Sequence, residues 1–263
     1  MSEVIRGIRE SEILGRAFEV DSFPSCIDGS LPVRLLYSVY GYLRFLGCYR
    51  KYDLFHIVDP ARLQGAVSDP AERRNAFLML GRLGERKGTY DLIAAVERAV
   101  RLNPALTVCL AGDGEVEKVR ALVKEKGLEK NITVPGWIGQ AEKLRRLRDA
   151  ATVVLPSCHE GLPMAILEGM AAGKAIISTT VGAIPEVVGP ENGILVEPGD
   201  VPALADALLR CSGSTELLAG MARRNREKAE QIFGVRRMHL RLVEYYKQVM
   251  EGGVRHGAGN PAD

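Results

Sequence analysis

Short apolar runs alternate with stretches of helical spacing from residue 76 onward. Leu92, Ile93, Val96 and Val100, for example, recur at the spacing of a helix with one buried face. Six apolar runs have the length of buried strands, and they cover residues 76–80, 106–110, 131–134, 152–155, 175–178 and 193–196. Continuous apolar strands separated by helices are typical of a parallel sheet covered on both faces. The pattern therefore predicts an α/β fold with a Rossmann-like, doubly wound parallel sheet.

Changes in this pattern divide the chain into four segments. Residues 1–75 carry weaker signals and are interpreted as a separate N-terminal region, with one further strand at 52–58. Residues 76–235 hold the doubly wound domain. Residues 236–251 are predicted to form a further helix, and 252–263 a disordered tail.

One stretch of the N-terminal region, residues 31–51, interleaves aromatic side chains with Arg and Lys and contains no acid. Such a segment suits the headgroup region of an anionic membrane or an interface with a partner protein. Arg34 and Arg44 argue against a membrane-spanning helix. A helix packed within the N-terminal region explains the same residues, and the sequence leaves both interpretations open.

Composition excludes several classes of function. The net charge of +2 gives no footprint for nucleic acid. The five cysteines are scattered and form no C-x-x-C pair, so neither a zinc site nor a disulfide framework is expected. We also find no D-x-D motif for a metal. These features favour a cytoplasmic location. Binding of residues 31–51 to a membrane surface would add peripheral attachment at the inner face of the membrane.

The turns that follow the predicted strands carry the candidate chemistry, since doubly wound sheets bind ligands beyond the carboxyl ends of their strands. Arg82 and Lys87 lie in the glycine-containing turn 81–88 and place two cations beside the start of a helix. A helix N-terminus already attracts anions, so this turn suits a phosphate. An ordinary exposed loop with basic residues remains an equal alternative. The turn at 112–115 begins like G-x-G-x-x-G, but Glu117 replaces the third glycine, which favours a simple tight turn.

The turn after the fourth predicted strand is the strongest signal. Pro163 suits the first turn of a helix, and Gly161 and Leu162 before it offer backbone amides to a ligand. Glu160 and Glu168 flank this turn, and carboxylates accept hydrogen bonds from pairs of ligand hydroxyls. Small residues follow Glu168 and indicate a tightly packed helix, which disfavours a solvated surface for this pair.

Three other features have competing interpretations. Trp137 either borders a ligand site or packs in the core. The charged run 142–148 is interpreted as a solvated helix face, and His159 as a neighbour of the site and not its catalyst.

Residues 76 to about 210 resemble the C-terminal, donor-binding domain of glycosyltransferase family 4, whose members have the GT-B fold. The motifs that carry the resemblance are listed in chain order: Gly81-Arg82-Leu83 with Lys87-Gly88, Ala111-Gly112-Asp113-Gly114, Gly136-Trp137, Glu160-Gly161-Leu162-Pro163 through Glu168, Val181 to Val188, and Gly193-Ile194-Leu195-Val196. The stretch from Glu160 to Glu168 matches the family's E-x7-E pattern. The order and spacing of these motifs make the resemblance specific. The resemblance is closest to enzymes of exopolysaccharide and capsule synthesis.

The resemblance implies a role for each candidate residue. Arg82 and Lys87 would hold the diphosphate of a UDP- or GDP-sugar, Glu160 the hydroxyls of the transferred sugar, and Glu168 the ribose. The backbone from Gly161 and Leu162 through Pro163 and Met164 would line the sugar and phosphate, with Trp137 and Ile138 near the base. The family retains the anomeric configuration, uses saccharide or lipid-linked acceptors, and needs no metal or other cofactor.

One departure from the family concerns the acceptor side. Residues 1–75 are much shorter than the acceptor-binding half of full-length members, which implies a reduced or truncated half and leaves the activity of the isolated chain open. Residues 236–251 correspond to the helix that crosses between the two halves. The alternatives to an active glycosyltransferase are a nucleotide-sugar-binding remnant that depends on a partner, and another GT-B enzyme such as a nucleotide-sugar epimerase.

Overall fold

The computed structural model describes residues 72–233 of the chain. Four predictions therefore lie outside the described residues: the segment 31–51, the strand 52–58, the helix 236–251 and the tail 252–263. The donor-side candidates all lie within the described part.

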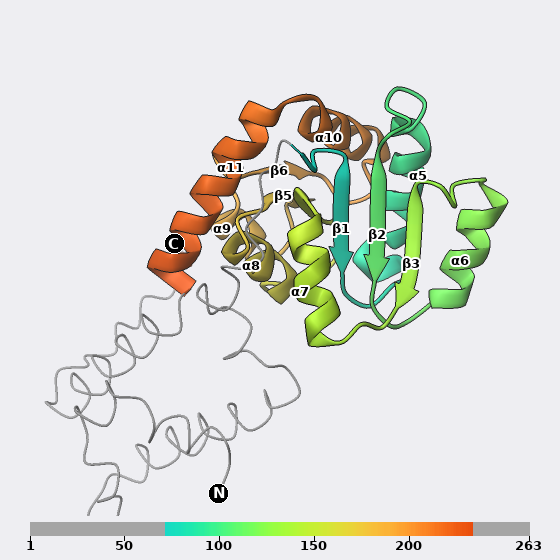
Figure 1. Ribbon diagram of the computed structural model, residues 1–263. Helices are drawn as coiled ribbons and strands as arrows, with labels where there is room; N and C mark the ends of the chain where they lie inside the picture. The colour runs from blue at the N-terminus through green and yellow to red at the C-terminus, as the bar shows by residue number, and fades with distance from the viewer. Residues whose placement is uncertain (1–71, 234–263) are drawn as a thin grey trace, which may run out of the picture. The chain divides into compact units, whose positions relative to one another are not determined.

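Six parallel strands form one sheet in the order β3-β2-β1-β4-β5-β6. The strands are β1 (Ala76–Leu80), β2 (Thr107–Ala111), β3 (Ile132–Gly136), β4 (Thr152–Leu155), β5 (Ala175–Thr179) and β6 (Gly193–Val196). The arrows of β1, β2 and β3 point the same way in Figure 1, so their carboxyl ends share one edge of the sheet. The predicted doubly wound α/β fold is confirmed.

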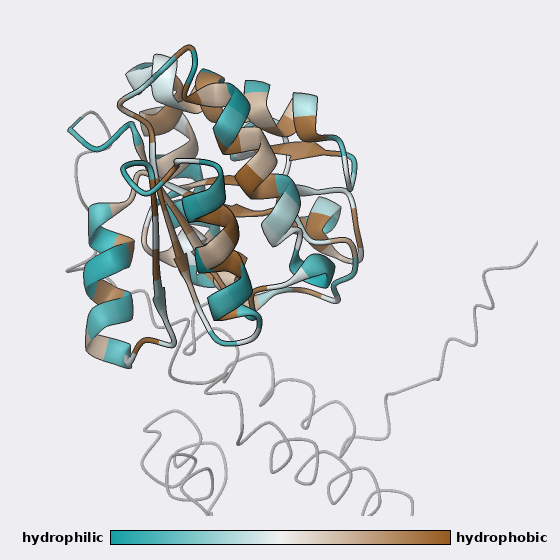
Figure 2. Cartoon of the chain, turned by 90° about the vertical axis from the view of Figure 1, so that its right-hand side faces the viewer, coloured by the Kyte–Doolittle hydropathy of each residue, from teal (hydrophilic) through white to brown (hydrophobic). Residues whose placement is uncertain are grey.

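Helices cover this sheet. They are η4 (Glu85–Lys87), α5 (Thr89–Ala99), α6 (Val116–Glu125), α7 (Gln140–Asp149), α8 (Met164–Ala171), α9 (Ile184–Val187), α10 (Val201–Gly213), α11 (Thr215–Lys228) and η5 (Ala229–Phe233). α10 packs along α5, while α11 packs against α8 and β5. In Figure 2 the strands are mostly brown and the helices carry both brown and teal stretches, as expected for elements with one buried side.

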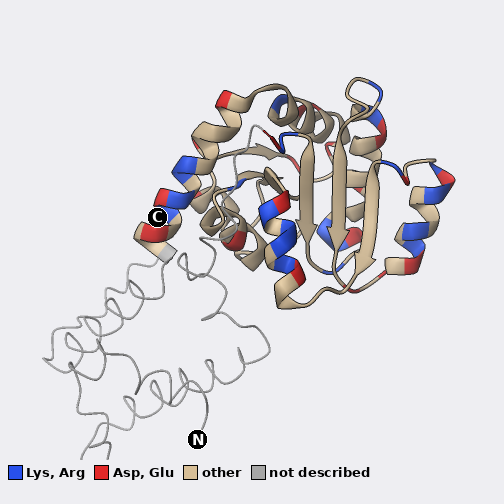
Figure 3. Ribbon diagram, in the orientation of Figure 1, with Lys and Arg blue, Asp and Glu red and all other residues tan. Residues whose placement is uncertain are grey.

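The core forms where the apolar strands meet the apolar faces of these helices. Met79, Val153, Ile176 and Leu208 are among the fully buried side chains. No strand of the sheet contains Lys, Arg, Asp or Glu, and Figure 3 shows these residues on helices and connections. A strand buried on both faces tolerates no charge, which explains why the apolar runs located the strands so well.

The strand order reverses between β1 and β4. From β1 the chain builds outward through β2 to the edge strand β3, then returns through α7 to place β4 on the other side of β1. Phe77 pairs with Thr152 and Leu78 with Val153 in parallel register. The turns that leave β1 and β4 therefore emerge side by side, at the position where doubly wound folds bind their ligands.

The main differences from the sequence prediction concern β3 and the helices that follow β6. β3 continues through Pro135 and Gly136, two residues past the predicted end, because an edge strand tolerates a proline without losing a ladder hydrogen bond. α10 and α11 were not among the predicted elements. Both helices start at a side-chain cap, since Asp200 accepts from the amide of Ala203 and Ser214 from that of Leu217.

Candidate functional site

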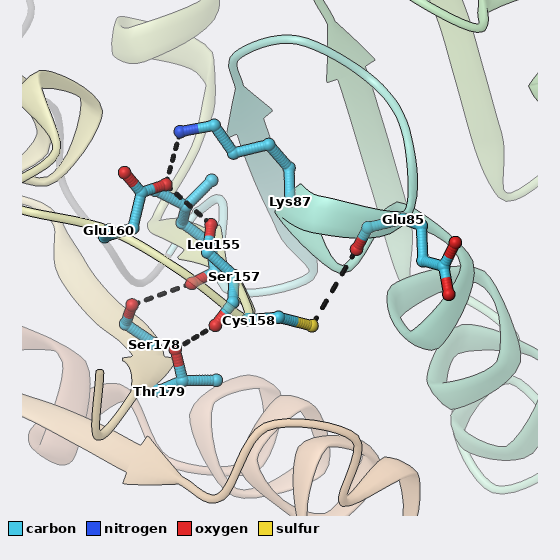
Figure 4. Close-up of polar contacts among 8 residues, drawn as sticks. All are labelled: Glu85, Lys87, Leu155, Ser157, Cys158, Glu160, Ser178 and Thr179. Atoms are coloured by element: carbon cyan, nitrogen blue, oxygen red, sulfur yellow. Dashed lines mark hydrogen bonds and ion pairs between the residues drawn. The ribbon is translucent and has the colours of Figure 1, made fainter. Parts of the chain in front are cut away.

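An ion pair joins the turn after β1 to the turn after β4. Nζ of Lys87, at the end of η4, contacts Oε1 of Glu160 (Figure 4). The two side chains are 16% and 8% exposed, so both charges lie largely out of water. This ion pair affects the binding of any ligand here, because a charge with little access to water interacts strongly with a ligand group that replaces its partner.

A ladder of hydrogen bonds from β5 holds the Glu160 turn in place. Oγ of the buried Ser157 donates to Oε1 of Glu160 at 2.8 Å. Oγ1 of Thr179 donates to the carbonyl of Ser157 at 2.6 Å, and Oγ of Ser178 donates to the carbonyl of Leu155 at 2.7 Å (Figure 4). These hydrogen bonds from the end of β5 continue the contact between the two strands past the end of β4. They fix the backbone that leads to Glu160.

Close backbone contacts hold together the turns after β1, β4 and β5. Gly88 has a φ of 66°, and a Cβ there would lie 1.9 Å from the carbonyl oxygen of Pro156. On the other side, Gly182 has a φ of 58°, and a Cβ there would lie 2.1 Å from the carbonyl oxygen of Glu160. Only glycine combines this backbone conformation with such an approach. The backbone around Glu160 is therefore positioned from both neighbouring turns.

α8 begins directly after this turn. Pro163 is buried and caps the helix with φ −74° and ψ 130°, so the helix starts at Met164. The expectation of Pro163 inside the first turn is corrected by one residue: the extended backbone of the proline precedes the first helical position. Gly169 lies against Val153 and Ile176, since a Cβ there would lie 2.9 Å and 3.0 Å from their side chains. The predicted tight packing of this helix is confirmed.

Glu168 is a carboxylate on the buried side of α8. The residue is 5% exposed, and Oε1 accepts a hydrogen bond from Nζ of Lys143 on α7 at 2.8 Å. Burial raises the pKa of Glu168 above its usual value, and the charge and hydrogen bond of Lys143 oppose that rise. A solvated surface position, the alternative for this residue, is excluded by its burial.

Four candidates lie at the surface near the carboxyl ends of the strands. Trp137 follows β3 and is 76% exposed, so the alternative that it packs in the core is wrong. Arg82 and Gly161 are exposed, while Ile138 and Met164 are partly buried and pack against the core.

Leu162 also belongs to this exposed set, at 36%. Two exposed apolar side chains thus lie in turns that follow strands of the sheet, Trp137 after β3 and Leu162 after β4. His159 is exposed as well, and the structure leaves its role as a bystander untested.

Sequence reasoning missed two residues of this site. Lys143 was counted in a solvated face, but it is 19% exposed and reaches Glu168, whereas its neighbour Arg145 is indeed exposed and pairs with Glu142. The signal was available only in the spacing from the buried Leu147, which lies one helical turn later. Ser157 was passed over because a serine after a strand is common in turns.

Two further features of the described part bear on function. Within residues 72–233, no three His, Cys, Asp or Glu side chains gather closely enough to hold a metal ion. Over the same residues, no helix combines the length and apolar character needed to cross a membrane.

Comparison with known proteins identifies the class. The fold is that of a glycosyltransferase domain, and residues 74–213 match the family model of the glycosyl transferases group 1. The match covers more than half of the chain, so the chain belongs to this family.

Relatives of known sequence carry names from polysaccharide synthesis. The putative colanic acid biosynthesis glycosyltransferase WcaL of Escherichia coli is 32% identical over 217 residues, which cover 78% of this chain and 53% of the relative. Glycogen synthase of Mycobacterium tuberculosis is 32% identical over 154 residues, covering 57% and 37%. The chain thus spans about half, or less, of the length of these relatives.

Solved structures share the fold. Sucrose-phosphate synthase from Thermosynechococcus elongatus superimposes with a TM-score of 0.60 at 26% identity, covering 70% of this chain and 47% of that one. The C-terminal domain of a group 1 glycosyltransferase, LpcC, from Francisella tularensis has a TM-score of 0.57 at 26% identity and is covered to 97%, against 65% of this chain. HepE from Anabaena, solved with UDP and glucose, has a TM-score of 0.60 at 24% identity, covering 67% and 49%.

Proposed function

We propose that this domain binds the UDP- or GDP-sugar donor of a retaining glycosyltransferase of family 4. In this proposal the whole protein transfers a hexosyl group to a saccharide or lipid-linked acceptor. The observation that carries it is the meeting of Lys87 and Glu160 at the turns after β1 and β4. That position is where the strand order reverses and where doubly wound folds bind nucleotides.

The charges at this edge suit the parts of a nucleotide sugar. Arg82 and Lys87 supply two cations for the diphosphate beside η4 and α5. Glu160 is the candidate catalytic residue, and its carboxylate would accept hydrogen bonds from hydroxyls of the transferred sugar. Glu168 would accept the hydroxyls of the ribose from the buried side of α8.

The remaining contacts would come from backbone and apolar groups. Residues 161–164, from Gly161 to Met164, lead into α8 and would line the sugar and phosphate with their amides. Trp137 and Ile138 would lie near the base. The exposure of Trp137 supports this role, since a large aromatic side chain left in water is available to a ligand.

The proposed reaction balances without a metal or another cofactor. The bond between the anomeric carbon and the phosphate oxygen breaks, and a bond to the acceptor oxygen forms on the same face of the sugar. The acceptor's proton passes to the leaving phosphate. Arg82 and Lys87 would stabilise the negative charge that develops on that phosphate.

The names of the relatives support a proposed activity in the synthesis of polysaccharides or envelope glycans. Attachment to a membrane surface, or to a partner protein that completes the acceptor side, is proposed for residues 31–51, which lie outside the described part. Salt-sensitive flotation with anionic vesicles would support attachment to a membrane surface. Absence of flotation with both neutral and anionic vesicles would rule it out.

The test of the proposed function is a donor screen followed by product analysis. Calorimetry with UDP, GDP and their sugars on the full chain should give one nucleotide preference. Turnover with a lipid-linked acceptor pool, read by NMR of the anomeric proton, should then give a product with the donor's configuration. Tight binding without transfer would support the binding remnant, and a changed sugar without transfer would support an epimerase.

A further inference from the structure

A second ion pair links the two helices on either side of β4. Lys143 lies on α7, which brings the chain back from β3, and Glu168 lies on α8, which follows β4. Nζ of Lys143 and Oε1 of Glu168 are 2.8 Å apart, and the side chains are 19% and 6% exposed. The pair is therefore largely buried, unlike the other ion pairs of α7.

The neighbouring cations of α7 serve a different partner. Arg145 and Arg146 both donate to Glu142 on the same helix, at 2.6 Å and 2.8 Å. Such local, exposed pairs contribute little to stability. Lys143 alone of these three cations leaves its own helix for a buried carboxylate, so its position is set by Glu168 and not by the helix.

Burial and Lys143 act on Glu168 in opposite directions. Burial raises the pKa of the Glu168 carboxyl, while the charge and the hydrogen bond of Lys143 lower it, and Lys143 is the charged group among the described residues that acts on it. The ionised carboxylate only accepts hydrogen bonds, whereas protonation turns one of its oxygens into a donor. A buried ion pair adds little net stability after desolvation, so stability alone does not account for this one.

We propose that Lys143 is a positioning residue for nucleotide recognition, which holds the Glu168 carboxylate from α7 so that its second oxygen accepts the ribose hydroxyls. The inference rests on the proposed nucleotide site and adds a residue to it. Lys143 acts through Glu168 and does not touch the phosphates. The ligand class that depends on it is a ribonucleotide, as opposed to a deoxyribonucleotide.

The experiment is a double-mutant cycle on the full chain, read by calorimetry with UDP or GDP, whichever wild type binds. The variants are Lys143→Met, Glu168→Gln, the pair of both, and Lys143→Arg. Arg145→Met, on the exposed face of the same helix, is the matched control. The double variant removes both charges together, so it folds without an unpaired buried carboxylate even where Lys143→Met does not.

The expected result has three parts. Lys143→Met weakens binding several-fold at pH 6 relative to wild type at the same pH, and the loss is smaller at pH 9, because removal of the ammonium raises the pKa of Glu168 further and a higher pH restores its carboxylate. In the Glu168→Gln background, Lys143→Met has no further effect. The loss shrinks for the 2′-deoxy nucleotide, while Lys143→Arg and Arg145→Met bind like wild type.

The contrary results separate the two proposals. A loss that is the same at pH 6 and pH 9, or that persists in the Glu168→Gln background, would mean that Lys143 contacts the ligand directly or acts only on folding, and would overturn this inference while the nucleotide site stands. Wild type that binds neither UDP nor GDP would overturn the proposed function, and this inference with it.

Discussion

Lys87 and Glu160, 73 residues apart in sequence, form an ion pair that joins the turns after β1 and β4. Each residue is also a candidate for a different part of the donor, the diphosphate for Lys87 and the sugar for Glu160. A diphosphate that takes the place of Glu160 at Lys87 would release the carboxylate for the sugar. This exchange makes the two candidate roles dependent on each other, and it can be tested with one substitution at a time.

The two glutamates should respond differently to neutralisation. Glu160→Gln should bind free UDP at least as tightly as wild type, because Lys87 loses its competitor, but should bind the UDP-sugar several-fold more weakly. Glu168→Gln should weaken both ligands alike, by about 1–3 kcal/mol for a lost charged hydrogen bond. The measurement is calorimetry with both ligands on both variants, or with the GDP pair if wild type prefers it. Equal losses for both ligands in both variants would contradict this division of roles.

Gly88 should be far less tolerant of alanine than Gly127, although both have a φ of 66°. At Gly127 a Cβ meets nothing within 4 Å, so Gly127→Ala should cost only the strain of the left-handed backbone, about 1–2 kcal/mol. At Gly88 the carbonyl of Pro156 must also move, so Gly88→Ala should cost more and should weaken nucleotide binding. Urea unfolding of the two variants measures the difference. Equal free energies of unfolding would show that the turns after β1 and β4 are not held as described.

The stability of the protein should depend on pH through the titration of Glu168. Because burial raises the pKa of the folded carboxyl above 4.5, the folded protein holds this proton more tightly than the unfolded chain does. The contribution of Glu168 to the free energy of unfolding is therefore largest at low pH, and it is lost as pH rises from about 4.5 through the folded pKa. Glutamine does not titrate. Glu168→Gln should thus gain stability relative to wild type between pH 5 and pH 8.

Urea unfolding of both proteins across that range is the check on this prediction. Glu97→Gln is a useful control, because the pKa of half-buried Glu97 is lowered by its hydrogen bond to Lys126, so Glu97 stays ionised in both the folded and the unfolded state over this range and its stability difference should not change with pH. A difference between wild type and Glu168→Gln that stays constant with pH would show that burial does not raise the pKa of Glu168.

Most of the sheet was predictable because its physical cause is local. Strands buried on both faces need unbroken apolar runs, and β1, β4 and β6 begin and end where those runs do. The same logic put the candidate residues that follow the strands on one edge of the sheet, since all six strands are parallel. The E-x7-E stretch could be assigned to a turn and a helix for this reason.

The partners of the charged residues could not be predicted in the same way. Lys143 and Glu168 are 25 residues apart, and which cation of α7 faces Glu168 depends on how that helix rotates against β4. Trp137 had two interpretations because one aromatic side chain after a strand fits a core or a surface equally well, and only packing decides. Its 76% exposure follows from its place beyond the end of an edge strand.

The central claim is that Lys87 marks the diphosphate site, and calorimetry on one substitution tests it most directly. UDP and GDP are titrated into the full chain, wild type and Lys87→Ala, with Lys124→Ala on the exposed side of α6 as the control. Lys87→Ala should weaken the preferred nucleotide by about 2–3 kcal/mol, at the low end for a buried charged contact because Lys87 gives up Glu160 in exchange. Lys124→Ala should bind like wild type. Unchanged affinity in Lys87→Ala would contradict the assignment of the site.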